Sequence, residues 1–494
     1  MDDTNLPPVP QTVQPTAFDQ PSITTEAPLP PTPVVAPVTP PSASGEVDVV
    51  KKSGRKFNLL PILLILILLT ALGVGGYFLL GTLQKSQITK LTYWGLWEPA
   101  VVMQPLIEEY QAANPNVQIT YQMESVREYR ERLQSALSQN RGPDIFRIHN
   151  SWIPMFKSDL APVPSTVFST SQYSSTFYPV ASESLTLNSQ HLALPLQYEG
   201  LIMYVNDQLL SENGLQVPSN WDELRSAAIT ISRCATETGA CKPGARVEVA
   251  GAGLGLTDNV DHWQDIVASL LLQNNVNLNS PSGRAAQDVF DFYSSFSRSL
   301  GVWESTLSPS TALFQSGKLA IYFAPSWRYH EIRQANPELS FSVHPIPQAP
   351  LDPERGERPV TWATFWAEGV NAKSKNAQAA WDFLAFLSTK ESLEKMYTAE
   401  VALGREFGEI YPRVDMQDTA QINPVVSTVL SGAANSRSWY LASYTFDGPT
   451  GINSRLSIAF ANVLSGKLQL DKLPAEINAI LGQYGLGSAP QIAQ

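Results

Sequence analysis

The feature that most constrains this chain is the apolar run at residues 59–80, LLPILLILILLTALGVGGYFLL, which contains no charged residue. As a helix rising about 1.5 Å per residue, this run would extend roughly 33 Å, enough to cross the hydrocarbon core of a membrane. Pro61 falls in the first turn, where its missing N–H costs little. We therefore predict a transmembrane anchor over residues 57–83.

The charges on either side of this run predict its orientation. The segment KKSGRK at 51–56 carries four positive charges, whereas the far side begins with only Lys85 and Lys90. This asymmetry places the N-terminus in the cytoplasm and everything after residue 84 outside the cell, as a single-pass protein of the cell membrane. A cleaved signal peptide is the alternative, but its apolar core would be shorter and would lie closer to the N-terminus.

The N-terminal segment has the composition of a disordered tail. Residues 1–50 contain 12 of the 38 prolines and neither Lys nor Arg. Such a segment buries too little apolar surface to offset the entropy lost on ordering, so we expect residues 1–56 to form a disordered cytoplasmic tail with a basic end. Docking of SH3-like partners on the prolines is an alternative use.

The segment after the anchor, residues 84–494, begins with alternating strand and helix patterns. Strands are predicted at 88–94, 117–123 and 145–149, with helices between them over 102–113 and 126–137. Repeated β–α–β units predict a parallel sheet covered by helices, with ligands near the carboxyl ends of the strands. Trp94 and Glu98 follow the first strand, and Asn150 and Trp152 follow the third.

Composition and motifs exclude several functions. A net charge of −12 argues against a nucleic-acid binder, which would carry a basic stripe. The sequence has no G-x-S-x-G, H-E-x-x-H or P-loop motif, and its five histidines and two cysteines lack metal-ligand spacing. We therefore expect no enzyme, no cofactor and no metal. An extracellular carbohydrate-active enzyme that uses two carboxylates is the alternative.

Aromatic residues occur repeatedly beside polar ones, in YWGLWE, HNSW, QYEG, PSWRYH, WATFW and SWY. Aromatic faces pack against the C–H surfaces of a sugar ring while carboxylates, amides and Arg bond its hydroxyls. This pattern favours a carbohydrate-binding cleft lined by Trp94, Glu98, Trp152 and Tyr198. For Trp97 the pattern leaves two positions open, the cleft and the core.

Several longer stretches carry a family resemblance. LTYWGLWEPAVVMQPLIEEYQAANPNVQITY, RGPDIFRIHNSW, LALPLQYEGLIMYVNDQLL, VPSNWDELRSAA, GKLAIYFAPSW and WATFWAEGVNAKSKNAQAAWDFLAFLS follow one another in the order seen in extracellular solute-binding proteins of the maltose-binding-protein type. These proteins are the receptors of ABC importers, and the resemblance covers about residues 88–480.

The resemblance implies a periplasmic-binding-protein fold, in which two α/β lobes are joined by hinge strands and close on a ligand in the cleft between them. The first lobe would comprise about residues 88–198 and 360–403. The second would comprise about residues 199–359 and 404–485. The tail and the single transmembrane helix would precede both lobes.

The resemblance also assigns individual positions. Glu199 matches a sugar-binding carboxylate of the family. Asn150 matches a ligand-binding Asp when the alignment is allowed to shift by one residue. Trp327 and either Trp439 or Tyr440 match aromatic residues that stack on sugar. Further candidates border the crossover between lobes and the segment GREFGEIYPR, namely Trp362, Phe365 and Arg405.

Two conclusions follow for the outward domain. In an oxidising compartment a Cys234–Cys241 disulfide is expected in place of two unpaired thiols. The expected function is a membrane-tethered receptor that captures a small solute, expected to be a sugar or oligosaccharide, and delivers it to the permease of an ABC transporter. A polyol, a glycerol phosphodiester or a peptide is the alternative ligand. A ligand-sensing ectodomain that signals through the cytoplasmic tail is the alternative.

Overall fold

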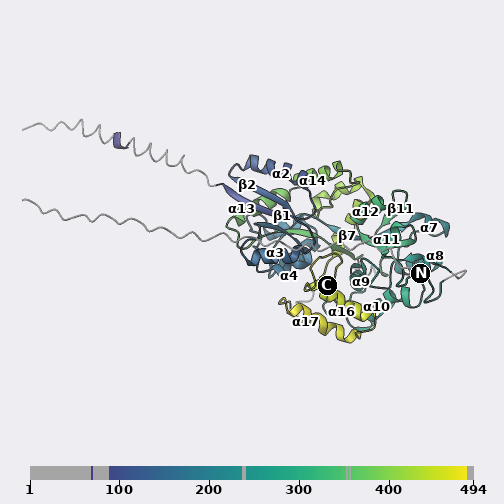
Figure 1. Ribbon diagram of the computed structural model, residues 1–494. Helices are drawn as coiled ribbons and strands as arrows, with labels where there is room; N and C mark the ends of the chain where they lie inside the picture. The colour runs from purple at the N-terminus through teal and green to yellow at the C-terminus, as the bar shows by residue number, and fades with distance from the viewer. Residues whose placement is uncertain (1–67, 71–87, 236–240, 352–353, 355–357, 487–494) are drawn as a thin grey trace, which may run out of the picture. The chain divides into compact units, whose positions relative to one another are not determined.

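The computed structural model describes residues 68–70, 88–235, 241–351, 354 and 358–486 (Figure 1). Its contacts divide the chain into two units, residues 1–83 and residues 84–494. In the first unit, residues 68–70 are helical. The predicted tail and the rest of the predicted anchor lie outside the described residues. Within the described ranges, no helix is both long and apolar enough to cross a membrane.

The second unit contains a first sheet of five strands in the order β2-β1-β3-β13-β6. Strand β1 pairs in parallel with both the edge strand β2 and β3, and β13 runs antiparallel to β3 and β6. The strands are β1 (Thr89–Gly95), β2 (Val117–Met123), β3 (Ile145–His149), β6 (Leu194–Pro195) and β13 (Trp366–Val370). The parallel pairing predicted for the first three strands is thus confirmed. It was predicted because these strands alternate with helices in the sequence.

Helices and a small hairpin cover this sheet. They include α2 (Ala100–Ala113), α3 (Tyr129–Ser138), α4 (Ile153–Phe156), α5 (Thr170–Thr176), α6 (Pro179–Ser184), α13 (Ala377–Leu387), α14 (Lys390–Ala402) and the hairpin β4 (Thr186–Leu187) with β5 (Gln190–His191). The core between them is aromatic and aliphatic. Tyr93, Phe146 and Phe383 are fully buried there, and Tyr93 and Phe383 pack edge to face with ring centroids 6.4 Å apart.

A second sheet is built around β7 and has the order β14-β12-β7-β10-β9-β8, with β11 also pairing with β7. Its central strands β7 and β10 are buried almost throughout, as expected for a sheet covered on both faces. The strands are β7 (Glu199–Asn206), β8 (Arg233–Cys234), β9 (Val247–Ala252), β10 (Leu319–Pro325), β11 (Phe341–His344), β12 (Thr361–Thr364) and β14 (Ser436–Arg437).

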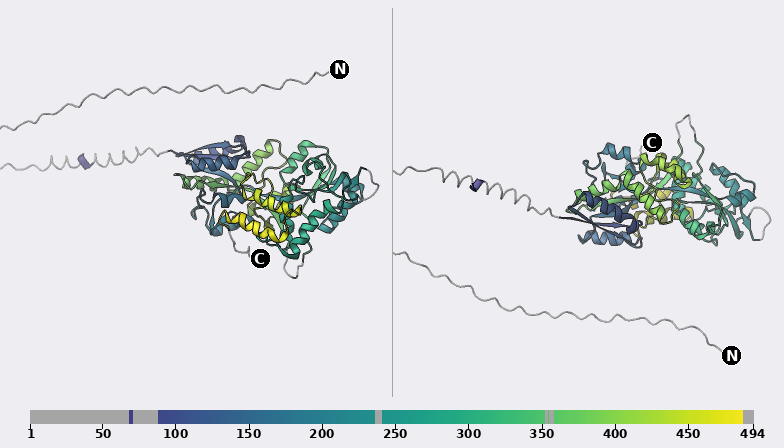
Figure 2. Two further views of the ribbon diagram at one scale, coloured as in Figure 1. Left: turned by 60° about the horizontal axis from the view of Figure 1, so that its bottom comes forward. Right: turned by 90° about the horizontal axis from the view of Figure 1, so that it is seen from above.

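The helices that follow or cover this second sheet are longer and more numerous. They are α7 (Asp207–Glu212), α8 (Trp221–Ile231), α9 (Trp263–Gln273), α10 (Gly283–Arg298), α11 (Ser310–Gln315), α12 (Arg328–Ala335), α15 (Pro424–Ser431), α16 (Ile452–Leu464) and α17 (Leu473–Gly482). Short 3-10 turns are η1 (Asn150–Trp152), η3 (Val414–Ile422), η4 (Ala433–Asn435) and η5 (Leu470–Lys472). The two C-terminal helices α16 and α17 pack together (Figure 2).

The chain passes between the two sheets at three places, the last between α14 on the first sheet and α15 on the second, and the first two crossings are neighbours. It leaves the first sheet after β6 and enters the second at Glu199, the first residue of β7. It returns between β12 and β13 through Phe365. These crossovers lie side by side, because Thr364 of β12 pairs directly with Glu199 of β7. Each sheet with its helices therefore forms one lobe, and the crossovers join the lobes.

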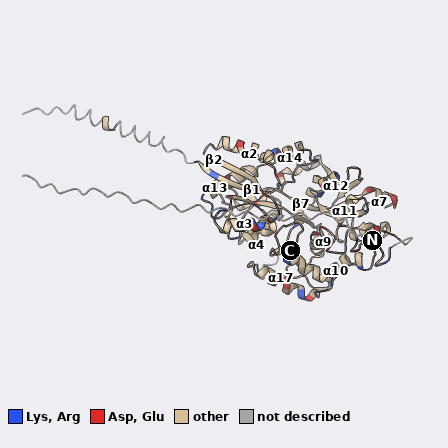
Figure 3. Ribbon diagram, in the orientation of Figure 1, with Lys and Arg blue, Asp and Glu red and all other residues tan. Residues whose placement is uncertain are grey.

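Charged residues of both signs are interspersed over the two lobes (Figure 3). Many of them pair locally, as in Lys395 of α14, whose Nζ lies 2.8 Å from carboxylate oxygens of both Glu109 and Glu391. These exposed pairs contribute little to stability.

Candidate functional site

A cavity of about 440 Å³ opens beside the first two crossovers. Its lining includes Gln197 and Glu199 from the first crossover and Thr364, Phe365 and Trp366 from the second. Residues from the ends of β3 and β10 complete it, so both lobes contribute side chains. Cavities of this size at the junction of two lobes are the usual form of a small-molecule site.

One side of the cavity is a row of five aromatic rings. Trp97 lies edge-on to Trp366, with ring centroids 5.8 Å apart, and 6.4 Å from Phe446. The row continues from Phe446 to Tyr444 at 5.9 Å and from Tyr444 to Trp327 at 5.5 Å. Trp97, Tyr444 and Phe446 keep 38–39% of their surface exposed, which is high for large rings in a folded protein. The row therefore offers apolar faces to a ligand.

Backbone strain sets the positions of two of these rings. Tyr444 has φ of 53° and Phe446 has φ of 49°, in the left-handed region that bulky residues rarely adopt. Thr445 between them is buried, and its carbonyl accepts a 3.0 Å hydrogen bond from Trp152 Nε1. Strain of this kind persists only where neighbouring bonds hold it, and it concentrates at binding sites.

Hydrogen bonds to two helices of the second lobe hold this segment at its ends. On one side Ser443 is buried, and its N–H donates to Asp265 of α9 at 3.0 Å. On the other side the Asp447 carboxylate accepts from the Asn453 N–H at 2.7 Å, at the start of α16. Segment 443–447 is thus fixed at each end, while Tyr444 and Phe446 keep exposed ring surface.

The opposite part of the cavity is polar. The carboxylate of Glu199 accepts a hydrogen bond from the Ser326 hydroxyl at the end of β10. Arg405 Nη1 lies 2.9 Å from Glu409 Oε1 and 3.5 Å from Glu400 Oε2. Burial, followed by the nearby Glu409 carboxylate, raises the pKa of Glu199 to about 8. This end can therefore both donate and accept hydrogen bonds.

A second guanidinium lies at the aromatic end. Arg328, the first residue of α12, stacks on the rings of Trp327 and Tyr444 at 4.3 and 4.7 Å. Its Nε donates to His262 Nε2 at 3.2 Å, and its Nη1 pairs with Glu331. Such cation–π contacts fix the rings as well as the cation.

Two histidines in the lining are uncharged at neutral pH. Burial lowers the pKa of His149 to about 3, and burial together with Arg405 lowers the pKa of His330 to about 4. His149 Nδ1 lies 2.7 Å from Ser151 Oγ. His330 Nε2 is buried without a hydrogen-bond partner among the described residues. An unpaired ring nitrogen of this kind is available to a ligand hydroxyl.

Four of the residues predicted to bind ligand line this cavity. They are Glu199, Trp327, Phe365 and Arg405. Trp97, which the sequence left divided between cleft and core, also lines it. The structure thus brings together residues that lie more than 300 positions apart in the sequence.

Four other predicted residues lie behind the lining of the first lobe. Glu98 is buried in an ion pair with Arg147. Asn150 is buried and donates to Ser438 Oγ at 2.8 Å. Trp152 has no exposed surface and packs in the core against Phe156 and Tyr129. Trp94 is half-buried in β1 outside the cavity lining. Each was expected to face ligand, but protein groups already occupy its polar atoms or ring faces.

The remaining four are also placed outside the cavity lining. Trp362 is buried and donates from Nε1 to Asp265 at 2.8 Å. Trp439 is buried and donates to Asn279 at 3.0 Å, and the half-buried Tyr440 packs beside it with ring centroids 5.9 Å apart. Tyr198 packs against Tyr178 at 5.6 Å. These side chains hold the crossovers and the second lobe together.

Several lining residues were not predicted. The clearest are Arg328, Tyr444 and Phe446, with Gln197 and Glu409. Tyr444 and Phe446 lie only four to six residues beyond Tyr440, in the stretch SWYLASYTFD that begins with the aromatic motif SWY. Alternation of exposed aromatic with buried polar residues was the signal available there.

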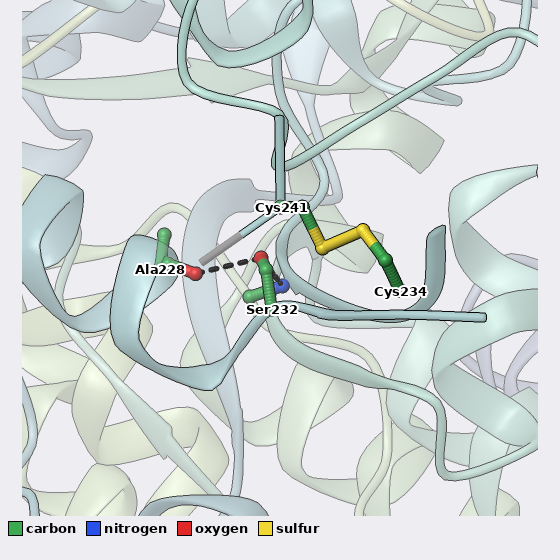
Figure 4. The surroundings of a disulfide bond; sticks show 5 residues. Ala228, Ser232, Cys234 and Cys241 are labelled. Atoms are coloured by element: carbon green, nitrogen blue, oxygen red, sulfur yellow. Dashed lines mark hydrogen bonds between the residues drawn. A yellow bond between two sulfur atoms is a disulfide. The ribbon is translucent and has the colours of Figure 1, made fainter. Parts of the chain in front are cut away.

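Cys234 and Cys241 form a disulfide in the second lobe, with Cα atoms 5.7 Å apart (Figure 4). Both cysteines are buried. Beside them Ser232 Oγ donates to the carbonyl of Ala228 at 2.7 Å and ends α8. Neither cysteine lies in the cavity lining.

The fold and the cavity together define a two-lobed solute-binding protein. The profile of the family described as bacterial extracellular solute-binding protein matches residues 105–405. This match spans more than half of the chain, and the chain belongs to that family. The predicted family resemblance is confirmed. Membership of this family also agrees with the prediction that the chain is not an enzyme, because the family consists of binding proteins.

Relatives and solved structures agree with this assignment. A Brucella abortus protein, named only as a binding protein, is 23% identical over 297 residues, 58% of this chain and 69% of that protein. A maltotriose-binding protein of Pyrococcus abyssi is 29% identical over 138 residues, 28% of this chain and 29% of that protein. The sugar-binding protein MalE of Xanthomonas citri is 17% identical, with a TM-score of 0.62 over 80% of this chain and 98% of that chain. At this identity, the structural likeness shows the two-lobed fold alone.

Proposed function

We propose that this chain is a receptor that captures a carbohydrate in the cavity and delivers it to an ABC permease, while a single membrane helix tethers it to the cell surface. The observation that carries the proposal is the row of exposed rings facing a polar end rich in hydrogen-bonding groups. Rings pack against the C–H faces of a sugar, and its hydroxyls need several donors and acceptors.

The charge of the cavity argues against an anionic solute. Glu199, Glu331 and Glu409 line it, and the two guanidinium groups of Arg328 and Arg405 are each already paired with a carboxylate. A phosphodiester would therefore find no unpaired positive charge in the lining. The binding of maltotriose by the relative in Pyrococcus abyssi supports a carbohydrate ligand, because the two chains share 29% of aligned residues.

Ligand binding is tested by thermal unfolding of the full chain in detergent micelles against a panel of mono- and oligosaccharides. A ligand at about 100 times its dissociation constant stabilises the folded state by roughly 2.7 kcal/mol. We expect at least one saccharide to raise the melting temperature, and the rise to shrink in the Trp97→Ala variant. Ile458→Ala is the control, since Ile458 is 61% exposed and lies outside the cavity. If no saccharide stabilises the protein, the proposal is wrong.

The membrane tether rests on the apolar, uncharged run at residues 59–80 and the basic cluster before it. It is tested by alkaline carbonate extraction of cells that express either the full chain or residues 84–494. We expect the full chain to remain with the membranes and the shorter chain to be extracted. Delivery to a permease is tested by uptake of the identified saccharide, which we expect to fall when the protein is deleted.

A further inference from the structure

The cavity holds one carboxylate that forms no ion pair with a protein cation, although the Arg405 guanidinium is near enough to act on it electrostatically. Of its charged lining residues, Arg328 pairs with Glu331, and Arg405 pairs with Glu409. Glu199 has no Lys, Arg or His within ion-pair distance among the described residues. Its polar contact is the hydroxyl of Ser326, a neutral donor. The lining therefore has three carboxylates and two guanidinium groups.

The position of Glu199 makes this imbalance relevant to a ligand. It is the first residue of β7, at the crossover between the lobes, and it is half-buried in the lining. A buried carboxylate without a counter-ion is costly, so it takes up a proton or a cation. Burial and the neighbouring Glu409 carboxylate hold the pKa of Glu199 at about 8, so that the empty site keeps a proton there at neutral pH.

The aromatic row lies opposite Glu199, and one end of it already stacks a cation. The guanidinium of Arg328 lies 4.3 Å from the ring centre of Trp327 and 4.7 Å from that of Tyr444. Within the described part of the chain, no Lys or Arg stacks on Trp97 or Phe446. These two rings are therefore available to the C–H face of a sugar ring.

We propose that the preferred ligand is a saccharide that carries an ammonium group, with the ammonium bound at Glu199 and the sugar ring against Trp97 and Phe446. This inference rests on the proposed carbohydrate-binding function and narrows its ligand class. The ammonium replaces the proton on Glu199, so that binding releases one proton from the protein. A neutral saccharide leaves that proton in place.

Proton release gives the proposal a measurable signature. Below pH 7 the ligand ammonium stays charged and Glu199 stays protonated in the free protein, so affinity should rise about tenfold per pH unit between pH 5.5 and 7.0. The other groups that face Glu199 are Glu409 and Arg405 from the segment after α14, Tyr198 from the crossover and Tyr204 of β7. The pKa values of both tyrosines are raised by burial, and that of His330 in the same cavity is about 4, so these three groups do not titrate in this range.

The test compares matched pairs of neutral and amino saccharides by isothermal titration calorimetry on the full chain in detergent micelles. Suitable pairs are glucose with glucosamine, galactose with galactosamine, and cellobiose with the β-1,4-linked disaccharide of glucosamine. We expect the amino member of at least one pair to bind at least tenfold more tightly at pH 7.0, and its affinity to fall about 30-fold at pH 5.5. Titration in two buffers of different ionisation heat should show release of about one proton.

Two variants separate this mechanism from a general effect of pH. Glu199→Gln should abolish both the preference for the amino saccharide and the dependence on pH. Glu394→Gln should keep both, because the Glu394 carboxylate is exposed, pairs with Lys390 and lies outside the cavity lining. If the Glu199→Gln variant does not fold, proton release on ligand binding to the unmodified chain tests the mechanism in its place.

The outcomes distinguish the two proposals. If neutral members bind as tightly as amino members at both pH values, the ammonium site is refuted while carbohydrate binding stands. If amino members bind without proton release, the role of Glu199 is refuted. If no saccharide of either kind binds, the proposed function itself is wrong.

Discussion

Removal of one buried guanidinium should reveal how the first lobe is held together. Arg147 of β3 has no exposed surface, and its Nη1 lies 2.5 Å from Glu98 Oε2. Its Nε and Nη2 lie 2.7 and 2.5 Å from Glu368 Oε1 on β13. Gln197, which lines the cavity, donates from Nε2 to Glu98 Oε1 at 2.9 Å. The Arg147→Met variant leaves two buried carboxylates without their cation.

The expected loss of stability is large. Breaking a buried ion pair by removing one partner costs about 3–5 kcal/mol, and here two carboxylates lose the same partner. With an unfolding entropy of about 2.1 cal/mol/K per residue over roughly 400 residues, each kcal/mol lowers the melting temperature by about 1.2 °C. The variant should therefore melt about 4–6 °C lower, as measured by scanning calorimetry at pH 7.

Dependence on pH and a surface control make this prediction specific. Burial already raises the pKa of Glu368, and removal of Arg147 raises it further. A carboxyl with a raised folded-state pKa favours folding at low pH and loses that effect as pH rises, so the deficit should be smaller at pH 5 than at pH 8. Arg225→Met is the control, because Arg225 pairs with Asp222 on the surface and should change stability by less than about 0.5 kcal/mol. Equal melting temperatures for the two variants would refute the reasoning.

Three further substitutions test other parts of the structure. Trp97→Ala should weaken saccharide binding by about 1–3 kcal/mol in titration calorimetry, with little loss of stability because the ring is partly exposed. Trp152→Ala should instead destabilise the fold by about 3–5 kcal/mol, because the Trp152 ring is fully buried. Reduction of the disulfide, whose cysteines are seven residues apart, should cost about 2–3 kcal/mol in denaturant titrations, and no change would contradict the bond. Asn150→Ala should cost about 1–3 kcal/mol, since it leaves the buried N–H of Phe365 without its side-chain acceptor, and an unchanged melting temperature would argue against this bond.

Much of the fold could be predicted from the sequence because its periodicities are regular. The strand predicted at 117–123 is β2 (Val117–Met123), and the strand predicted at 145–149 is β3 (Ile145–His149). The stretch SKNAQAAWDFLAFLS has apolar residues at helical spacing, and they are buried on one face of α13 (Ala377–Leu387). Burial of one helical face or of a whole strand leaves a local pattern in the sequence.

The positions of individual site residues left no such pattern. Glu98 resembles any other acid at a helix start, and nothing local indicates that Arg147, 49 residues later, takes its carboxylate. Tyr444 and Phe446 reach the cavity through a left-handed backbone, which residue preferences argue against. Long-range pairing and strained turns depend on the assembled fold, so sequence reasoning found the neighbourhood of the site more reliably than its lining.

Four of the eight predicted residues that miss the cavity nevertheless lie directly behind it. Three are bonded to a lining residue or to the immediate neighbour of one, and the fourth, Trp362, is linked to a lining residue through Asp265. The pairs are Glu98 with Gln197, Asn150 with Phe365, Trp152 with Thr445, and Trp362 with Asp265, which in turn holds Ser443.

This arrangement has a simple geometric cause. Where the chain bends at the end of a strand, one side chain of a neighbouring pair can face the cavity while the other faces the lobe core. Trp97 and Glu98, in the bend after β1, are such a pair, since the ring of Trp97 is exposed in the cavity while the carboxylate of Glu98 is buried and paired with Arg147. The aromatic and polar residues at these strand ends therefore either line the cavity or pack directly behind its lining. Ligand affinity should depend on the residues that line the cavity, and the rigidity of that lining should depend on the residues packed behind it.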